Sequence, residues 1–255
     1  MIKLLKILLS GACGKMGKTV ALCAQNYESL SIICGVDKFK AEQYSDFPVY
    51  GDFESVKESP DIIIDFSSAD ILSSLLDFAL SSSLPVVIAT TGYSDEQIAE
   101  IKKASEKIPV FFTFNFSLGV NLLTALSKKA ASVLGDSFDI EIIEKHHNQK
   151  IDAPSGTALM LADAINGVAD NKYSYEFDRH SRRMKRPQNE IGIHSVRGGT
   201  IVGEHEVIFA GEDEVITLSH SASSKKIFAN GALKAAGFLK DKKSGIFDMN
   251  DILSL

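Results

Sequence analysis

The sequence predicts an α/β protein with two domains, the first built on a doubly wound parallel sheet and the second on a mixed or antiparallel sheet. Three observations support this. In the first half of the 255-residue chain, short apolar runs alternate with amphipathic stretches. In the second half, several β-like runs follow one another directly. A glycine-rich turn separates the first apolar run from the first helical pattern.

The apolar runs of the first half are expected to be parallel strands, because they are apolar throughout and are separated by helical patterns. The expected strands are 4–9, 31–36, 61–66, 85–89 and 109–113. The expected helices are 15–26, 69–81 and 95–106, and Ser94 is placed to cap the last of them.

The order of expected helices and strands changes after about residue 117. Helices are expected at 118–134, 158–165 and 225–239, and strands at 138–146, 191–196, 204–210 and 214–219. A polar, basic loop is expected over 171–189, and an apolar tail over 245–255. Successive strands without intervening helices favour a second domain with a mixed or antiparallel sheet.

Composition excludes several classes of protein. The formal charge of −6 argues against a nucleic-acid partner. No apolar run reaches the ~18 residues that a transmembrane helix needs, so no membrane partner is expected. The three cysteines, at positions 13, 23 and 34, are odd in number and crowded together. They are expected to be reduced thiols of a cytoplasmic protein, and neither a disulfide framework nor a metal site.

The glycine-rich turn reads Gly11, Ala12, Cys13, Gly14, Lys15, Met16 and Gly17. This G-x-x-G-x-x-G pattern between a strand and a helix is typical of a Rossmann-like domain, in which a dinucleotide pyrophosphate lies at the helix N-terminus. Asp37, 20 residues after Gly17, is placed to bind the adenosine ribose hydroxyls. Lys38 could neutralise a 2′-phosphate, which would allow both NADH and NADPH. The alternatives are a structural turn and a solvated lysine.

Two segments follow the last two strands expected in the first half. They consist of Ala89, Thr90 and Thr91, and of Thr113, Phe114, Asn115 and Phe116. Because ligands of open α/β sheets bind outside the carboxyl ends of the strands, both segments could approach a nicotinamide ribose. Ordinary turn chemistry explains the same composition.

The catalytic candidates lie in the segment 141–157, EIIEKHHNQKIDAPSGT. His146, His147 and Lys150 could supply protons and positive charge. Ser155, Gly156 and Thr157 precede an apolar helical run and offer free N–H groups and hydroxyls, which suit a carboxylate. A metal site is the competing interpretation, but adjacent histidines on a strand point in different directions. A solvated surface loop is another.

The pattern E-x-x-E-x-H-H-x-x-K-x-D-A-P-S-G-T resembles the signature of the 4-hydroxy-tetrahydrodipicolinate reductase (dihydrodipicolinate reductase) family. The resemblance spans nearly the whole chain. It also includes ATTG at 89–92, FNFSLGVN at 114–121, RGGTIVGEH at 197–205, FANGA at 228–232 and GIFDM at 245–249.

The resemblance implies a role for each matching residue. His146 matches a proton donor and acceptor, and Lys150 a second proton donor. His147 with Ser155, Gly156 and Thr157 matches the groups that hold the substrate carboxylates. The cofactor segments match Gly11 to Met16, Asp37, Lys38, Ala89 to Thr91 and Thr113 to Phe116. Ala89 replaces an expected glycine and Asp37-Lys38 varies an acidic–basic pair, which leaves the choice between NADH and NADPH open.

The resemblance further implies a dinucleotide-binding domain at 1–117, rejoined by 222–255, and a substrate-binding and oligomerisation domain at 118–221. The expected activity is NAD(P)H-dependent reduction of 4-hydroxy-tetrahydrodipicolinate, a small dicarboxylate, to tetrahydrodipicolinate in the diaminopimelate and lysine pathway, by a homotetramer. The alternatives are another two-domain nicotinamide dehydrogenase and a non-catalytic dinucleotide-binding redox sensor. The basic run 179–186 is interpreted as a solvated loop, with steering of a dianionic substrate as a second interpretation. The segment 197–199 is expected to be a structural turn.

Overall fold

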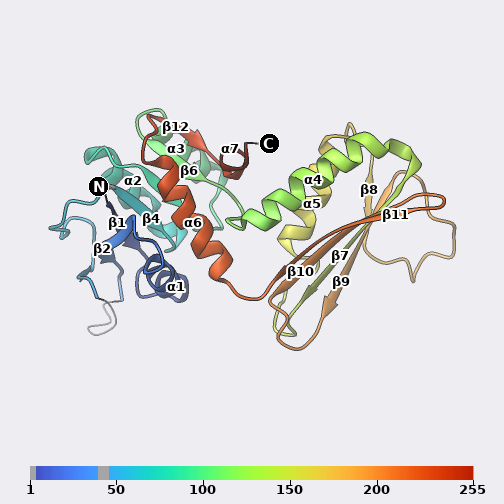
Figure 1. Ribbon diagram of the computed structural model, residues 1–255, viewed down its shortest axis with the longest axis horizontal. Helices are drawn as coiled ribbons and strands as arrows, with labels where there is room; N and C mark the ends of the chain where they lie inside the picture. Colours follow the sequence, from blue (N-terminus) through green and yellow to red (C-terminus); the bar gives the residue numbers. More distant parts are fainter. Residues whose placement is uncertain (1–3, 40–45, 255) are drawn as a thin grey trace. The chain divides into compact units, whose positions relative to one another are not determined.

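The computed structural model describes residues 4–39 and 46–254. The chain forms two compact units, Met1–Leu118 together with Lys225–Leu255, and Gly119–Ser224 (Figure 1). The division expected from the sequence, after residue 117 and before residue 222, differs from these limits by one and three residues.

The first unit contains a seven-stranded sheet, and its neighbouring strands are parallel. In spatial order the strands are β12 (Gly245–Phe247), β6 (Pro109–Phe112), β5 (Val86–Ile88), β4 (Ile62–Asp65), β1 (Leu5–Ser10), β2 (Leu30–Val36) and β3 (Val49–Tyr50). Read from β3 to β6 this is the order typical of Rossmann sheets, with β12 added at the far edge. The order reverses between β1 and β4, so a ligand crevice is expected at the carboxyl ends of these two strands.

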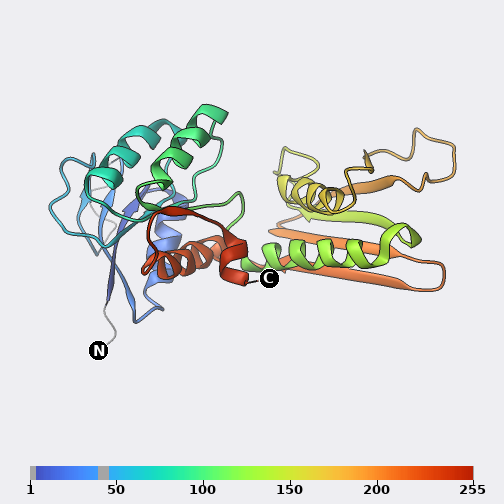
Figure 2. The ribbon, with the colours of Figure 1, turned by 90° about the horizontal axis from the view of Figure 1, so that it is seen from above.

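The strands of this sheet are largely apolar because helices cover both faces. Ile7 and Leu9 of β1 belong to one core, with α1 (Lys15–Ala24) and α6 (Lys226–Leu239). Leu8 belongs to the other core, with α2 (Leu72–Ser81) and α3 (Asp95–Ser105). Figure 2 shows the two helical layers of this unit on opposite sides of its sheet. The predicted parallel α/β domain is therefore confirmed.

Two short helical elements complete the first unit, a 3-10 turn at Ala69–Ile71 before α2 and α7 (Met249–Leu253) near the chain end. The N-terminus of α3 is a capping box: the Gln97 backbone N–H donates to Ser94 Oγ at 3.3 Å, and the Ser94 N–H donates to Gln97 Oε1 at 3.0 Å. The cap predicted at Ser94 is confirmed.

The second unit has a five-stranded mixed sheet, with two helices over one face. In spatial order its strands are β11 (Val215–Ala222), β10 (Gly203–Ala210), β7 (Asp139–His146), β9 (Glu190–Arg197) and β8 (Ser174–Glu176). β10 is antiparallel to β11 and β7, whereas β9 is parallel to β7 and β8. The helices α4 (Leu118–Leu134) and α5 (Gly156–Gly167) pack on the core face, and a 3-10 turn at Gly135–Ser137 follows α4.

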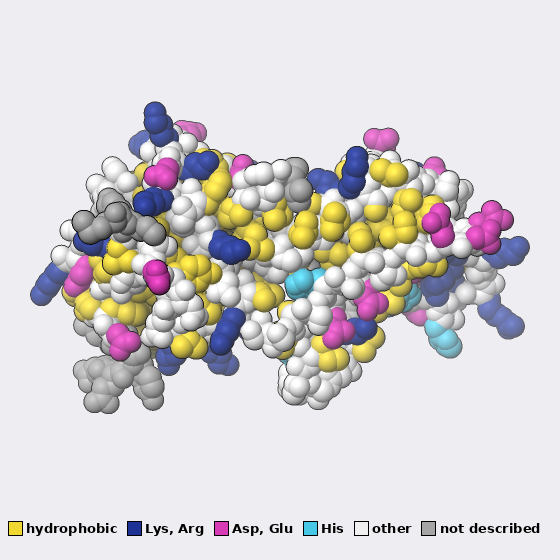
Figure 3. Space-filling model, viewed as in Figure 1, with side chains coloured by type: hydrophobic (Ala, Val, Ile, Leu, Met, Phe, Trp, Pro, Cys, Tyr) yellow, Lys and Arg dark blue, Asp and Glu magenta, His cyan; other side chains and the backbone are white. Residues whose placement is uncertain are grey.

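The outer side of α4 carries exposed apolar side chains, Leu122, Leu126 and Val133. Figure 3 shows hydrophobic side chains, in yellow, along the part of the second unit where this helix lies. Within the described residues, no helix combines the length and the apolar character required to cross a membrane.

Three strands were not predicted, because each is only two or three residues long: β3, β8 and β12. The loop predicted over 171–189 is wrong at Ser174–Glu176, where β8 pairs with β9 through Tyr175 opposite Ile191. β12 extends the first sheet by pairing with β6, so the apolar tail includes an edge strand.

Candidate active site

The glycine-rich loop after β1 has the conformation that its residues predict. Gly11 has φ +76°, and a Cβ there would lie 2.4 Å from the Phe66 carbonyl oxygen. A Cβ at Gly17 would lie 2.1 Å from the Gly11 carbonyl oxygen. Both positions therefore require glycine, the first for its backbone conformation and the second for close packing of α1 against the loop.

The N-terminus of α1 suits an anion. Its N-cap is Gly14, which is exposed and has no side chain to accept the first helical N–H groups. The first turn carries no acidic side chain. The amide groups and the positive end of the helix dipole therefore remain available to a pyrophosphate, so the loop fits the phosphates of a dinucleotide.

Asp37, at the end of β2, is fixed by the glycine loop. Its carboxylate accepts hydrogen bonds from the backbone N–H of Cys13 and from that of Phe39, both at 2.9 Å. A carboxylate has about four acceptor positions, so Asp37 can still bind ribose hydroxyls. The residue expected to recognise the ribose also links the phosphate loop to β2.

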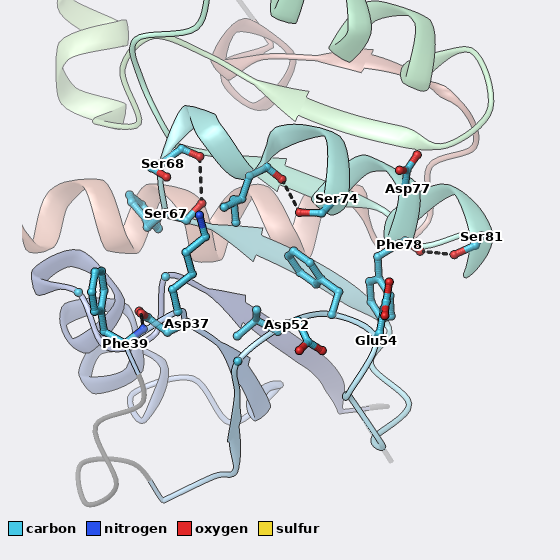
Figure 4. A pocket seen from close by; sticks show the side chains of 18 residues that line it. Asp37, Phe39, Asp52, Glu54, Ser67, Ser68, Ser74, Asp77, Phe78 and Ser81 are labelled. Carbon is cyan, nitrogen blue, oxygen red and sulfur yellow. Dashed lines mark hydrogen bonds between the residues drawn. The ribbon is translucent and has the colours of Figure 1, made fainter.

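A cavity of about 640 Å³ opens beside this loop (Figure 4). Gly11, Gly14, Asp37 and Lys38 line one part of it, and Phe66, Ser67 and Ser68 follow β4 into it. Its volume lies in the range of small-molecule and cofactor sites. The other lining residues, largely from segment 51–54 and the α2 region, include the carboxylates of Asp52, Glu54 and Asp77, and Lys38 is the only cation among the described lining residues.

Asp65 connects the strand ends around the crevice. This fully buried carboxylate, at the end of β4, accepts hydrogen bonds from Ser10 Oγ at 2.7 Å, Ser67 Oγ at 2.5 Å and Thr90 Oγ1 at 2.6 Å. Burial raises the pKa of Asp65, and the three hydroxyl donors oppose that rise. The group thereby ties together the carboxyl ends of β1, β4 and β5.

The two predicted nicotinamide segments follow β5 and β6, which are neighbours in the sheet. Thr90 is buried against Asp65, whereas Thr91 is exposed. Phe114 is exposed, and Asn115 Oδ1 accepts from the Ser117 N–H at 2.9 Å. The Phe116 side chain is in the core and can face a ligand only through its backbone.

The second unit holds the predicted catalytic residues on β7, the following loop and the start of α5. His146 is the last residue of β7 and is buried, and its Nδ1 lies 2.6 Å from Glu144 Oε2. Glu144 is fully buried and receives two hydrogen bonds from the Arg197 guanidinium. Burial raises the pKa of Glu144, but hydrogen bonds from Arg197 and His146 outweigh burial and lower it to about 2.

The start of α5 is capped by Ser155, whose Oγ accepts from the Ala158 N–H at 3.2 Å and lies 3.0 Å from His205 Nε2. Ser155 is therefore already engaged within the protein. Gly156 is exposed and Thr157 half-buried, so the first turn of α5 is the part that a carboxylate can reach. Burial is the main cause that lowers the pKa of His205 to about 4, so this imidazole is neutral at pH 7.

Lys150 lies in the loop between β7 and α5. Its Nζ forms an ion pair with Asp152 Oδ1 at 2.8 Å, and its N–H donates to the His147 carbonyl oxygen at 3.1 Å. Because Asp152 is exposed, this ion pair is weak and a substrate carboxylate can replace it. His147 is half-buried at the start of the same loop.

The structure therefore gathers the sequence candidates in two sets, one in each unit. Sequence reasoning missed Phe66, Ser67 and Ser68, although they follow a strand end as the other cofactor candidates do. It also missed Glu144 and Arg197. Arg197 ends β9 and is not part of a turn, and the turn that follows is at Gly199 and Thr200.

The basic run is not a simple solvated loop. Arg179 pairs with Glu190, Arg182 with Glu176, and Arg186 with Asp139 and Glu141. Arg179 and Arg186 therefore hold the loop against the sheet of the second unit, and the interpretation as solvated charge is wrong for these two, whereas Arg182 remains exposed beside its partner. Among the described residues, no three His, Cys, Asp or Glu side chains converge as metal ligands would.

A Rossmann sheet with a phosphate-binding loop, followed by an α/β unit with a buried histidine–carboxylate pair, places the protein in the class of NAD(P)H-dependent oxidoreductases. Two family models then match consecutive parts of the chain. "Dihydrodipicolinate reductase, N-terminus" matches residues 5–116, and "Dihydrodipicolinate reductase, C-terminus" matches residues 119–253. The chain belongs to the dihydrodipicolinate reductase family, which confirms the resemblance inferred from its motifs.

Relatives with this name are similar over the full chain. The 4-hydroxy-tetrahydrodipicolinate reductase of Caldanaerobacter subterraneus subsp. tengcongensis is 52% identical over 250 residues, which covers 98% of each chain. That of Clostridium novyi is 46% identical, covering 97% of this chain and 98% of the relative. Family membership favours an enzyme and argues against the redox-sensor alternative.

Solved structures agree with the fold. A dipicolinate-bound dihydrodipicolinate reductase from Paenisporosarcina sp. TG-14 has a TM-score of 0.82 and 26% identity, covering 98% of this chain and 99% of that chain. A scyllo-inositol dehydrogenase from Lactobacillus casei, solved with NAD(H) and scyllo-inositol, has a TM-score of 0.59 and 14% identity, with 96% and 92% coverage. The second likeness shows only that the fold is shared with other nicotinamide dehydrogenases.

Proposed function

We propose that this protein catalyses the NAD(P)H-dependent reduction of 4-hydroxy-tetrahydrodipicolinate to tetrahydrodipicolinate in diaminopimelate and lysine biosynthesis. The observation that carries the proposal is the strand–loop–helix segment from β7 to α5. It combines a buried histidine–carboxylate pair, a lysine and a helix N-terminus within residues 144–157. The full-length relatives that bear the name of this activity support it.

The first unit is the dinucleotide-binding part in this proposal. The α1 N-terminus holds the pyrophosphate, Asp37 the adenosine ribose, and the segments after β5 and β6 the nicotinamide end. When bound, the cofactor supplies a hydride to ring carbon 4 of the substrate. Lys38 is the residue we assign to a 2′-phosphate, so the enzyme is expected to accept both NADH and NADPH.

The second unit is the substrate-binding part. The substrate is a cyclic dicarboxylate, and Lys150, His147 and the first turn of α5 hold its two negative charges. Ser155 shapes that turn as its N-cap. His146 donates the proton that completes the reduction and recovers one from solvent. The overall reaction consumes one hydride and one proton and releases one water from the ring hydroxyl.

A coupled assay tests the activity directly. Pyruvate and aspartate semialdehyde, with the synthase that joins them, generate the substrate in place, and loss of nicotinamide absorbance is followed with NADH and NADPH separately. Oxidation that depends on this protein supports the proposal. Absence of oxidation by a protein that binds NADH would assign it to another dehydrogenase reaction.

Replacing His146 tests the proton-transfer role. We expect His146→Gln to lower kcat by roughly 10²–10⁴, the usual contribution of general acid–base catalysis, with NADH binding unchanged. A variant with near-normal kcat would remove His146 from this role.

Assembly and location remain predictions. We propose a homotetramer in the cytoplasm, and light scattering of the purified protein tests the first part. We also expect the three cysteines to be reduced thiols in that compartment.

A further inference from the structure

Glu144 is a charged residue at a position where the strand faces the core. Residues 140, 142, 144 and 146 of β7 are buried, whereas the residues between them are not. Glu144 is fully buried, with no access to water. A carboxylate at such a position is costly unless it is paired and hydrogen-bonded, so its partners indicate what it does.

Hydrogen bonds from Arg197, Ser155, Ser195 and His146 hold this carboxylate. Arg197 donates from Nη1 to Oε2 at 2.8 Å and from Nη2 to Oε1 at 2.7 Å. The Ser155 backbone N–H donates to Oε1 at 3.1 Å. His146 Nδ1 lies 2.6 Å from Oε2. Because an ionised carboxylate only accepts, Nδ1 of His146 carries the proton in this contact.

We propose that Glu144, anchored by Arg197, is a positioning residue for proton transfer by His146: it binds Nδ1–H and so leaves Nε2 as the atom that exchanges the proton with the substrate. This inference rests on the proposed function of His146. Glu144 touches neither substrate nor cofactor in this scheme and acts only through the imidazole.

The surroundings of the imidazole are consistent with this. A Cβ at Gly203 would lie 3.0 Å from His146 Nε2, so a glycine at the start of β10 leaves space at that edge of the ring. His205 packs against His146 edge to face, with ring centroids 5.2 Å apart. The ring is thus held at Nδ1 by a charged hydrogen bond and on one side by a second imidazole.

The proton balance is simple. His146 in its doubly protonated form releases the Nε2 proton to the reduced ring and keeps the Nδ1 proton on the hydrogen bond to Glu144. Solvent then returns a proton to Nε2. Glu144 stays ionised throughout, because the hydrogen bonds of Arg197 lower its pKa far below neutrality despite burial. It orients the ring and stabilises the imidazolium that forms, without itself exchanging a proton.

The chain contains a matched control on the same strand. Glu141 also binds an arginine and a histidine: Arg186 Nε at 2.9 Å and His194 Nε2 at 2.8 Å. It lies on the opposite face of the sheet from Glu144. A glutamate of β7 therefore contacts an arginine and a histidine at two places, and only the set on the core face includes the proposed proton donor.

The test is a double-mutant cycle on kcat with the coupled assay, using Glu144→Gln, His146→Gln and the double variant, with Glu141→Gln as control. We expect Glu144→Gln to lower kcat about 10- to 100-fold, as loss of a residue that orients a functional imidazole does. The double variant should match His146→Gln within about 3-fold, because Glu144 acts only through that histidine. Glu141→Gln should change kcat less than about 3-fold.

The outcomes separate this inference from the proposed function. If His146→Gln is as active as the wild type, the role of His146 fails, and this inference fails with it. If His146→Gln lowers kcat as expected but Glu144→Gln lowers kcat by the same factor in both backgrounds, the proposed function stands and Glu144 is only structural. NADH affinity, which depends on the other unit, and the melting temperature show whether each variant is folded.

A second measurement covers the case in which Glu144→Gln does not fold. Proton NMR of the wild type should show an imidazole N–H resonance far downfield of the amide region, as expected for a short, charge-assisted hydrogen bond. We expect His146→Gln to remove that resonance and His194→Gln to leave it. Its persistence in His146→Gln would assign it elsewhere and overturn the proposed hydrogen bond.

Discussion

Replacing Glu144 by glutamine should destabilise the second unit by an amount that depends on pH. The pKa of Glu144 is lowered from 4.5 to about 2 in the folded protein, because the hydrogen bonds of Arg197 and His146 outweigh its burial. A shift of that size corresponds to about 3 kcal/mol of stability at pH 7. This agrees with the roughly 3–5 kcal/mol lost when one partner of a buried ion pair is removed.

The direction of this pH dependence follows from the linkage between proton binding and folding. Because the folded pKa lies below the unfolded one, the contribution is complete above pH 4.5 and is lost as the pH falls toward 2. With these two pKa values, about 1 kcal/mol remains at pH 3. Glutamine cannot titrate, so the stability difference between wild type and Glu144→Gln should shrink by roughly 2 kcal/mol between pH 7 and pH 3.

The assay must report on the second unit alone. We suggest urea titrations at pH 7, 5 and 3, each followed by a short hydrogen-exchange pulse at one fixed pH and mass spectrometry of the peptide that contains β7. Glu141→Gln serves as a control for a partly exposed carboxylate on the same strand. A stability difference that is equal at pH 7 and pH 3 would refute the buried, ionised Glu144 described above.

Three further predictions concern the first unit. Gly11→Ala should raise the Kd for NADH at least about 10-fold in a fluorescence titration. The positive φ of this position costs alanine about 1–2 kcal/mol, and the new Cβ would displace Phe66. Unchanged affinity would mean that the loop does not contact the cofactor. Ser94→Ala should lower the free energy of unfolding by about 1 kcal/mol without changing kcat, because it removes one half of the capping box with Gln97; an effect on kcat would contradict a purely local role. Lys38→Ala should raise KM for NADPH roughly 10-fold more than KM for NADH, because it removes one charged hydrogen bond to the 2′-phosphate. Equal effects on both KM values would mean that Lys38 does not bind the 2′-phosphate.

Much of the first unit could be predicted because its strands are buried on both faces. Runs such as 62–64 and Val86–Ile88 are apolar and bounded by helical patterns, so both their type and their parallel arrangement follow from the sequence. β3 and β12 could not be predicted in this way. Each gains its strand conformation by pairing with an edge of an existing sheet, and a run of two or three residues carries no periodicity.

The arginines of the basic run show a different limit. Arg179 and Arg186 look like solvated charge in the sequence, but they pair with Glu190 and Glu141 on strands of the second sheet. The two residues of each pair are 11 and 45 positions apart in the sequence, respectively. Local sequence patterns therefore cannot predict these pairs. Only the tertiary fold determines whether a charge on a loop faces water or a carboxylate.

The contact between Glu144 and His146 could in principle have been predicted from the sequence. Along β7 the alternation of Ile140 and Ile142 identifies the core face, and Glu144 and His146 continue it. A glutamate on the core face of a strand must have a cation or several donors, and a histidine two residues later shares that face. The sequence alone could therefore have suggested that Glu144 binds His146. It could not have supplied Arg197, which is 53 residues away on a neighbouring strand and was interpreted as part of a glycine turn. Side chains alternate between the two faces of a strand. Glu141 therefore lies on the other face of β7 from His146, although it also binds an arginine and a histidine. Glu141 and Glu144 are three residues apart, which is an odd number, so they face opposite sides of the sheet. Only Glu144 therefore reaches the proposed proton donor.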